Sequence, residues 1–331
     1  MGPALDEGMR SFLGERLGNY ERVEPLAGDA SARAYWRVRG RGGPWVLCFD
    51  RGFIGAAPET YPFVVVYHLL KGRVPVPGIL TMDAGRGLFL MEDLGDDLLE
   101  SLFPSMTEQR VKRIYSDCVE SLFAIQTTRG EGLPFSLGFD AVKLMYEFDF
   151  FIEHALEGHF GIPADDDMIP SLRREFLKIA ELLDRPGYFV LNHRDYHSRN
   201  IIIHRGVPHV IDYQDARMGL PQYDLVSLIR DSYVRLDESL FEWLKDLYYE
   251  GSRDRGIHSM GRDEFDWYFD LMAFQRNVKA MGTFGYQSAR MGNQRYERYI
   301  APTADYLEGY AGCRNELARA WELLEPLLRK R

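Results

Sequence analysis

Two short segments place polar oxygen atoms at a spacing that suits phosphoryl transfer. In the first, residues 193–200, four residues separate Asp195 from Asn200, and the second is an apolar stretch that ends at Asp212. Phosphoryl transfer needs a carboxylate that accepts the proton of the attacking hydroxyl, together with ligands for the metal that neutralises the phosphates. Magnesium prefers hard oxygen ligands and keeps some of its water, so an amide and a carboxylate suffice. Each residue alone would be typical of a polar turn, but the joint pattern favours a kinase.

The loop around Asp195 also resembles a known family. His197 stands two residues after Asp195, where protein kinases usually carry lysine, and this is typical of the aminoglycoside phosphotransferase and choline kinase branch of the protein-kinase-like fold. Within that branch, five segments resemble the bacterial anomeric kinases of N-acetylmuramic acid and N-acetylglucosamine. These segments are residues 28–38, 193–200, 211–216, 223–231 and 279–284. The resemblance therefore extends over nearly the whole chain.

The resemblance implies both a fold and an activity. The fold would be an α+β, two-lobed, protein-kinase-like fold of the aminoglycoside phosphotransferase type, with a small β-rich lobe at residues 1–94 and a larger helical lobe at residues 95–331. ATP and Mg²⁺ would be the cofactors, and the anomeric hydroxyl of N-acetylmuramic acid or N-acetylglucosamine would be phosphorylated during cell-wall recycling. The alternatives are another small-molecule kinase of this fold, acting on an aminoglycoside, choline or a different sugar, and a non-catalytic nucleotide-binding protein.

The resemblance also assigns roles at the predicted nucleotide site. Asp195 corresponds to the catalytic base, and Asn200 and Asp212 correspond to the magnesium ligands. Small residues in the first loop would let backbone N–H groups approach the phosphates, and the backbone near residues 91–94 would contact adenine. The nucleotide-binding residues that the resemblance implies are Gly28, Asp29, Ala30, Ser31, Arg33, Glu92 and Leu94.

One position departs from the kinase pattern. Cys48 lies on the third expected strand, about where kinases present a lysine to the phosphates. We expect another cation to replace it, with Arg33 as the first candidate and Arg37 as the second. The alternative is that magnesium carries more of the phosphate charge.

Residues that contact the acceptor are expected in the helical part of the chain. The candidates are His197, Arg230, Asp231, Arg276 and Lys279. The three cations could hold the carboxylate of N-acetylmuramic acid, although each is also typical of a surface charge. Asp224 precedes an apolar helix and is predicted to cap its N-terminus. His193 is predicted to shape its loop through a hydrogen bond.

Hydrophobic periodicity predicts the elements that position these residues. In the first ninety-odd residues we expect strands at 23–26, 34–39, 44–50, 79–82 and 87–91 and one helix at 59–70. A capping box at Ser105 and Glu108 predicts the next helix start, and Asp140 and Ser171 begin two more. Strands return at 188–192 and in a hairpin over 201–213. The remainder reads as helical from residue 224, with loops at 251–261 and 282–293.

The composition limits the class of protein. The formal net charge is −10, which argues against a nucleic-acid binder. Three widely spaced cysteines favour neither a disulfide framework nor a zinc site. No signal-peptide pattern and no apolar stretch of membrane-spanning length are present. We therefore expect a cytoplasmic protein whose partners are ATP and a small-molecule sugar, without a membrane partner, and its oligomeric state remains open.

Overall fold

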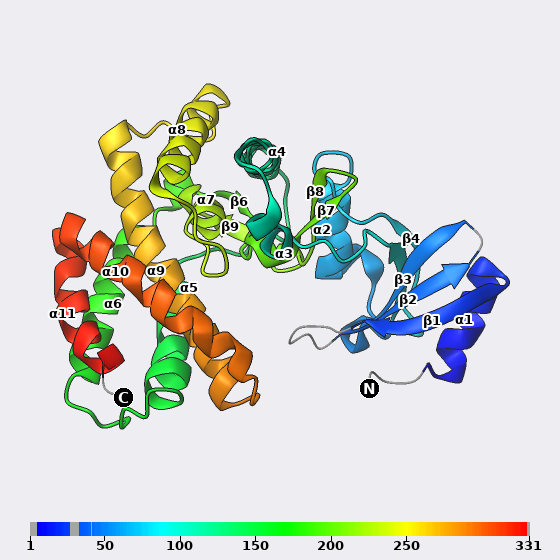
Figure 1. The fold of residues 1–331 in the computed structure, drawn as a ribbon, viewed down its shortest axis with the longest axis horizontal. Coiled ribbons are helices and arrows are strands. Elements are labelled where there is room, and N and C mark those ends of the chain that lie inside the picture. The colour runs from blue at the N-terminus through cyan, green and yellow to red at the C-terminus, as the bar shows by residue number, and fades with distance from the viewer. Residues whose placement is uncertain (1–4, 27–32, 41, 330–331) are drawn as a thin grey trace.

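The computed structural model describes residues 5–26, 33–40 and 42–329, and the chain forms two lobes (Figure 1). The first lobe contains a five-stranded antiparallel sheet in the order β1-β2-β3-β5-β4. Its strands are β1 (Tyr20–Leu26), β2 (Ala34–Gly40), β3 (Gly43–Phe49), β4 (Ile79–Asp83) and β5 (Leu88–Glu92). Two helices, α1 (Glu7–Leu17) and α2 (Pro62–Leu70), accompany the sheet.

The centre of the sheet is covered on both faces because successive side chains of a strand point in opposite directions. Leu88 and Leu90 of β5 pack in a cluster with Phe12 of α1. Phe89 lies between them and packs against Phe63 of α2, with the ring centroids 5.2 Å apart. Strand β5, which lies between β3 and β4, is thereby packed on both faces, and it fixes the start of the segment that leads into the second lobe.

The second lobe is mainly helical (Figure 1). Its helices are α3 (Leu99–Leu102), α4 (Glu108–Gln126), α5 (Ala141–Phe151), α6 (Ile169–Leu183), α7 (Gln222–Ile229), α8 (Glu238–Asp254), α9 (Arg262–Ala289), α10 (Ile300–Cys313) and α11 (Asn315–Arg329). Between α6 and α7 the chain forms two antiparallel strand pairs, β6 (Val190–Asn192) with β9 (Arg217–Gly219), and β7 (Ile201–His204) with β8 (Val207–Val210). The hairpin predicted over residues 201–213 is confirmed by the β7–β8 pair.

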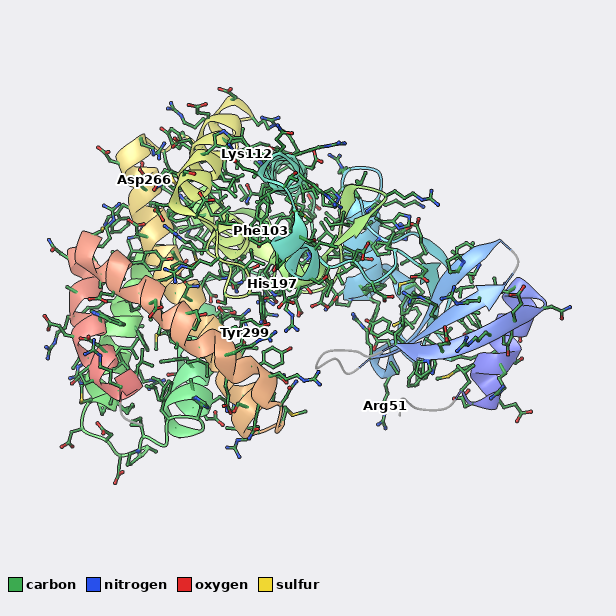
Figure 2. The ribbon with its side chains drawn as sticks, in the orientation of Figure 1. Arg51, Phe103, Lys112, His197, Asp266 and Tyr299 are labelled. Carbon is green, nitrogen blue, oxygen red and sulfur yellow. The ribbon has the colours of Figure 1, made fainter. Side chains whose placement is uncertain are left out.

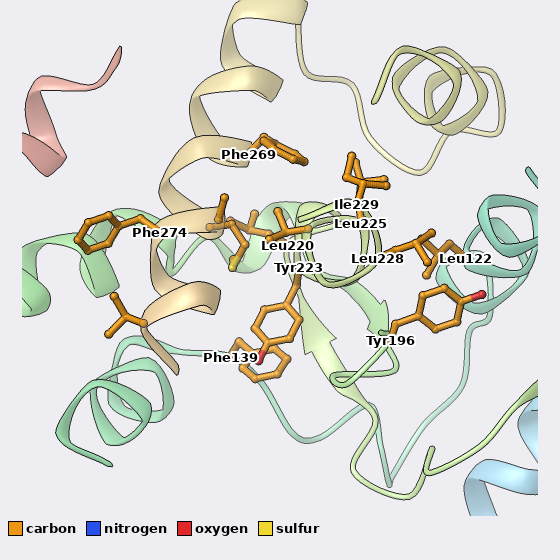
Figure 3. Close-up of a cluster of buried hydrophobic side chains, with 14 of the residues drawn as sticks. Leu122, Phe139, Tyr196, Leu220, Tyr223, Leu225, Leu228, Ile229, Phe269 and Phe274 are labelled. Atoms are coloured by element: carbon orange, nitrogen blue, oxygen red, sulfur yellow. The ribbon is translucent and has the colours of Figure 1, made fainter. Parts of the chain in front are cut away.

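Helix α7 lies at the centre of the helical lobe. Leu225, Leu228 and Ile229 are fully buried, and Figure 3 shows them among side chains from the surrounding helices. Tyr223, at the start of α7, stacks on Phe139 with the ring centroids 4.0 Å apart. Every residue of α7 is buried, so its position is set by packing on all sides, and it provides a rigid support for nearby loops.

The α+β, two-lobed class expected from the sequence is confirmed. A lobe boundary after residue 94 remains our proposal, and it falls in the segment that joins β5 to α3. Within residues 5–26, 33–40 and 42–329, no helix combines the length and the apolar character needed to cross a bilayer.

Several helix starts differ from the predictions, including that of α6, which begins at Ile169 rather than at Ser171. Helix α2 begins at Pro62, later than predicted, because residues 58–60 form a short 3₁₀ turn and proline suits the first turn of a helix. Thr107, rather than Ser105, caps α4 through its side-chain oxygen. Asp140 caps α5 as the sequence predicts. Local signals therefore identified these helices, but not every terminal residue.

The predicted loop at residues 282–293 begins too early, because α9 continues to Ala289 and only residues 290–293 lie outside a helix. Its glycines mark close packing rather than the end of the helix. A Cβ atom at Gly282 would lie 2.8 Å from the Cα of Phe151, and one at Gly285 would lie 2.5 Å from the carbonyl oxygen of His154. Glycine is required there because α9 crosses the backbone that follows α5 at close range.

Candidate active site

A cavity of about 1200 Å³ lies between the two lobes. Arg33, Glu92 and Leu94 line it from the sheet-rich lobe, and much of residues 193–200 lines it from the helical lobe. Figure 2 shows His197 of this loop on the side of the helical lobe that faces the sheet. Asp195, Asn200 and Asp212, the predicted base and metal ligands, all line this one cavity. The tertiary structure therefore brings the predicted chemistry together.

The 193–200 loop connects β6 to β7 in an uncommon backbone conformation. Arg194 has a φ of 87°, a region that residues with a side chain seldom adopt. The carboxylate of Asp224 holds this turn by accepting the backbone N–H of His193 at 2.5 Å and that of Arg194 at 2.9 Å. The ring Nε2 of His193 lies 3.0 Å from the carbonyl oxygen of Ile211. The predicted loop-shaping role of His193 is confirmed.

Asp224 therefore anchors the loop, and the predicted N-cap role is wrong. Helix α7 begins at Gln222, and Pro221 takes the cap position without a side-chain bond. Asp224 is fully buried. Burial raises the pKa of its carboxyl to about 7, although its bonds to two backbone N–H groups favour the charged form. The sequence around Asp224 suggested the start of a helix. In the structure, the hydrogen-bond partners of Asp224 are instead the backbone N–H groups of the 193–200 loop.

Replacing Asp224 with alanine is expected to destabilise the protein and to lower its turnover. The change leaves two buried backbone N–H groups without an acceptor, at a cost of about 1–3 kcal/mol each. The control is Asp237→Ala, which removes the exposed cap of α8, costs about 1 kcal/mol and should leave kcat unchanged. Thermal unfolding and initial rates measure both effects. An Asp224→Ala protein with the melting temperature and kcat of the wild type would contradict the anchoring role.

Asn200 and Asp212 offer donors that fit magnesium. The side-chain amide of Asn200 donates to the carbonyl oxygen of Asp195 at 2.9 Å, which leaves its oxygen for another partner. Asp212 has a φ of 65°, a strained conformation that persists chiefly at functional positions. An amide and a carboxylate oxygen suit an ion that takes its other ligands from phosphates and water. In the described part of the chain, no group of three or more His, Cys, Asp and Glu side chains could hold a metal alone.

Among the described residues, three cations lie close to Asp195. Lys279 Nζ lies 2.5 Å from Asp195 Oδ1, and Arg276 Nη1 lies 3.6 Å from the same oxygen. Arg194 Nη1 lies 4.0 Å from Oδ2. Burial opposes the charge on Asp195, but the cations outweigh it and hold the pKa of this carboxyl well below its usual range. Asp195 is thus an ionised but weak base, and it suits a hydroxyl that is already acidic.

The acceptor-binding candidates occupy different surroundings. His197 is half-buried, and loss of solvation lowers its pKa to about 3, so its ring is neutral. Its Nδ1 has no hydrogen-bond partner among the described residues. Asp231 accepts the backbone N–H of Ser198 at 2.9 Å and so forms a second anchor of the loop. Arg230 Nη2 lies 3.2 Å from Glu238 Oε1, so Arg230 pairs with Glu238 rather than with the adjacent Asp231. The binding roles of these residues, and of Arg276 and Lys279, remain predictions.

The predicted nucleotide site is described in part. Gly28, Asp29, Ala30 and Ser31 lie outside the described residues. Arg33 Nε lies 2.6 Å from Asp50 Oδ2, and its guanidinium stands over the ring of Phe63 at 4.9 Å. Cys48 is buried, and burial raises the pKa of its thiol to about 12. A neutral thiol therefore occupies the position that the resemblance assigns approximately to the kinase lysine.

Arg37 forms a bridge to the segment that follows β5. Its Nε lies 2.6 Å from Asp93 Oδ2, and its Nη1 lies 2.7 Å from Asp96 Oδ2. In the same segment, the carbonyl oxygen of Leu94 lies 3.0 Å from His204 Nδ1. These contacts hold in place the segment around residues 91–96, where adenine is predicted to bind. We retain Arg33 as the candidate for the phosphate cation because the guanidinium of Arg37 is bound to two carboxylates.

Sequence reasoning missed Glu147 of α5. It is 3% exposed and lines the cavity. Gln275 Nε2 donates to its Oε2 at 3.0 Å, and Arg194 Nη2 lies 3.7 Å from its Oε1. A signal was present in the sequence, because Glu147 falls beside Leu144 and Phe148 on the apolar face of its helix. A carboxylate on such a face needs a buried cation or a ligand.

Comparisons with known proteins agree with this geometry. Residues 22–257 match the phosphotransferase enzyme family. The N-acetylmuramate/N-acetylglucosamine kinase of Pseudomonas aeruginosa is 31% identical over 328 residues, which cover 96% of this chain and 92% of that protein. The protein of the same name from Neisseria meningitidis is 30% identical over 313 residues, which cover 91% of this chain and 89% of that protein.

Solved structures share the fold at lower identity. The ADP-bound aminoglycoside phosphotransferase APH(2'')-Ib superposes with a TM-score of 0.63 at 13% identity, covering 90% of this chain and 97% of that one. The choline kinase LicA of Streptococcus pneumoniae superposes with a TM-score of 0.57 at 15% identity, covering 91% of this chain and all of that one. These likenesses show that the chain has the aminoglycoside phosphotransferase, protein-kinase-like fold.

Proposed function

Because the chain belongs to the phosphotransferase enzyme family, we propose that it transfers the terminal phosphoryl group of ATP to the anomeric hydroxyl of N-acetylmuramic acid or N-acetylglucosamine. The observation that carries the proposal is the cavity in which Asp195, Asn200 and Asp212 meet. The names of the relatives that are about 30% identical support the amino sugar as acceptor. The intact set of three residues speaks against a non-catalytic nucleotide-binding protein.

The charge on the helical-lobe side of the cavity supports a neutral or anionic acceptor. The complete lining is balanced, with eight Arg and Lys residues and eight Asp and Glu residues, but the part between residues 146 and 296, where the acceptor is expected, carries six Arg and Lys residues and four Asp and Glu residues. Aminoglycosides and choline are cations, and a cationic lining would repel them. A neutral N-acetylated sugar, or one that carries a carboxylate, suits this environment better.

The weak basicity of Asp195 supports the anomeric position. An anomeric hydroxyl is more acidic than a primary alcohol, so it can give its proton to a carboxylate of low pKa late in a loose transition state. Magnesium, held by Asn200 and Asp212, would neutralise phosphate charge. The oxygen of the acceptor would form a bond to phosphorus while Asp195 takes its proton, and ADP would leave. The product would be a sugar 1-phosphate.

The same proposal suggests a biological setting. Recycling of cell-wall sugars in the cytoplasm fits an enzyme that uses ATP on these acceptors. The three cysteines are free thiols, two of them buried, which fits a reducing compartment.

The reducing end of the sugar provides the test. Phosphorylation at the anomeric oxygen destroys the reducing end, whereas phosphorylation of the primary hydroxyl preserves it. We would incubate N-acetylglucosamine, N-acetylmuramic acid, kanamycin and choline separately with enzyme, ATP and magnesium. We expect one reducing end to be lost for each ATP consumed with the two amino sugars, and little ATP consumption with the two cations. ATP consumption with the reducing end preserved would contradict the anomeric position, and a preference for kanamycin or choline would contradict the acceptor class.

A further inference from the structure

The ion pair between Lys279 and Asp195 joins two distant parts of the chain. Lys279 lies on α9, its side chain is 14% exposed, and its ammonium is 2.5 Å from the carboxylate. Arg276 lies one turn earlier on the same helix and is 6% exposed. Its Nε is buried and has no hydrogen-bond partner among the described residues. Helix α9 therefore presents a buried cation, Arg276, and a largely buried one, Lys279, to the carboxylate that must receive the proton of the acceptor.

The ammonium of Lys279 lies close to where the phosphoryl group would be transferred. Asp195 must be within hydrogen-bonding distance of the acceptor hydroxyl. The hydroxyl oxygen must in turn lie about 3–3.5 Å from the terminal phosphorus before it attacks. A lysine ammonium on a flexible four-carbon chain, with three rotatable donors, can therefore turn from Asp195 to an oxygen of the transferring group.

The sheet-rich lobe provides little unpaired positive charge for the transferred phosphoryl group. In phosphoryl transfer, negative charge spreads over the oxygens of the transferred group. The kinase lysine position holds the buried, neutral Cys48, and Arg33 shares its charge with Asp50. A cation supplied from the helical lobe would face the transferred group from the side of the acceptor.

We propose that Lys279 is a catalytic residue whose ammonium binds the phosphoryl group as it passes from ATP to the acceptor. The acceptor oxygen forms a bond to the terminal phosphorus, and the bond from that phosphorus to the bridging oxygen breaks. The electron pair of that bond leaves on ADP, and the acceptor proton goes to Asp195. Lys279 stays protonated and donates a hydrogen bond to a non-bridging oxygen. This inference rests on the proposed kinase function, but it holds for whichever hydroxyl is the acceptor.

The first test compares Lys279→Met with Arg290→Met. Arg290 follows the end of α9, and its guanidinium lies 3.9 Å from Glu153 at an exposed position. We expect Lys279→Met to lower kcat about 10²–10³-fold, as does the loss of one donor at a developing negative charge. The KM for ATP should stay within about threefold, because the contact forms in the transition state. Arg290→Met should match the wild type. A Lys279→Met enzyme with wild-type kcat, or one that loses only ATP affinity, would overturn the proposal.

Chemical rescue separates a catalytic amine from a structural one. Lys279→Ala leaves a space at the ammonium position, and added ethylammonium should restore kcat in this variant about tenfold or more. The same amine should not stimulate the wild type or Arg290→Met. Tight ADP binding by each variant verifies that the site is folded. Folded Lys279→Ala protein that does not respond to ethylammonium would overturn the proposal.

The pH profile adds an independent readout. Burial lowers the pKa of Lys279 to about 8, although Asp195 partly opposes this shift. Arg276, Arg194 and Glu147 also face the ammonium. The amine is charged below this pH and loses its proton above it, so kcat/KM for ATP should fall on the alkaline side in the wild type. In Lys279→Arg the alkaline limb should move to higher pH, because guanidinium does not titrate there. An unmoved limb would contradict the proposal.

The two proposals fail in different ways. If the wild type consumes no ATP with any acceptor, the proposed function is wrong. If the wild type is active and Lys279→Met is equally active, the function stands and only the role of Lys279 is wrong.

Discussion

Replacing Asp195 with asparagine is expected to lower kcat about 10²–10⁴-fold. The amide keeps the shape of the side chain but cannot accept the proton of the acceptor. The KM for ATP should stay nearly unchanged, because the predicted metal ligands are intact. Steady-state rates with N-acetylglucosamine and ATP measure both constants.

The surroundings of Asp195 add a second expected result. The variant removes the counter-charge of Lys279, Arg276 and Arg194, so these largely buried cations repel one another without compensation. We therefore expect a lower melting temperature that added phosphate partly restores by binding to the cluster. The control is Asp254→Asn, an exposed carboxylate at the end of α8, which should change neither quantity. An Asp195→Asn enzyme that keeps more than about a tenth of wild-type kcat would exclude Asp195 as the base.

Replacing Asp212 with alanine is expected to have the next largest effect. A bound metal contributes several kcal/mol to the stabilisation of transition-state charge, so loss of its carboxylate ligand should lower kcat about 10²–10³-fold. The magnesium concentration that gives half-maximal rate should rise. Initial rates measured over a magnesium titration, at saturating ATP and acceptor, report both changes.

Two further variants make the magnesium experiment specific. Asp212→Asn keeps one oxygen and tolerates the left-handed backbone at this position, so its effect should be smaller than that of Asp212→Ala. Asn200→Ala removes a neutral ligand, and high magnesium should partly rescue it. A wild-type magnesium titration curve in Asp212→Ala or in Asn200→Ala would show that the residue concerned does not hold the metal.

Local sequence determined the 193–200 loop and most of the secondary structure. Asp195 and Asn200 lie on one short loop, and Asp212 follows the hairpin that begins at the end of that loop, so their proximity requires only a few residues of chain. The strands of the first lobe and the cap at Asp140 also follow from periodicity and hydrogen-bonding chemistry over a few residues. The resemblance to anomeric sugar kinases added the family and the two-lobed fold.

Tertiary packing decided what surrounds the loop. Lys279 and Asp195 are 84 residues apart in sequence, and Asp224 accepts N–H groups about 30 residues away. Nothing local distinguishes Lys279 from a surface lysine or Asp224 from a helix cap. Likewise, the glycines of α9 predict a loop from sequence alone. Only the structure shows that they allow close contact with the backbone at the end of α5 and just after it. Periodicity and capping depend on neighbours within one or two turns, whereas the charge and hydrogen-bond partners of a buried group depend on which distant elements pack against it.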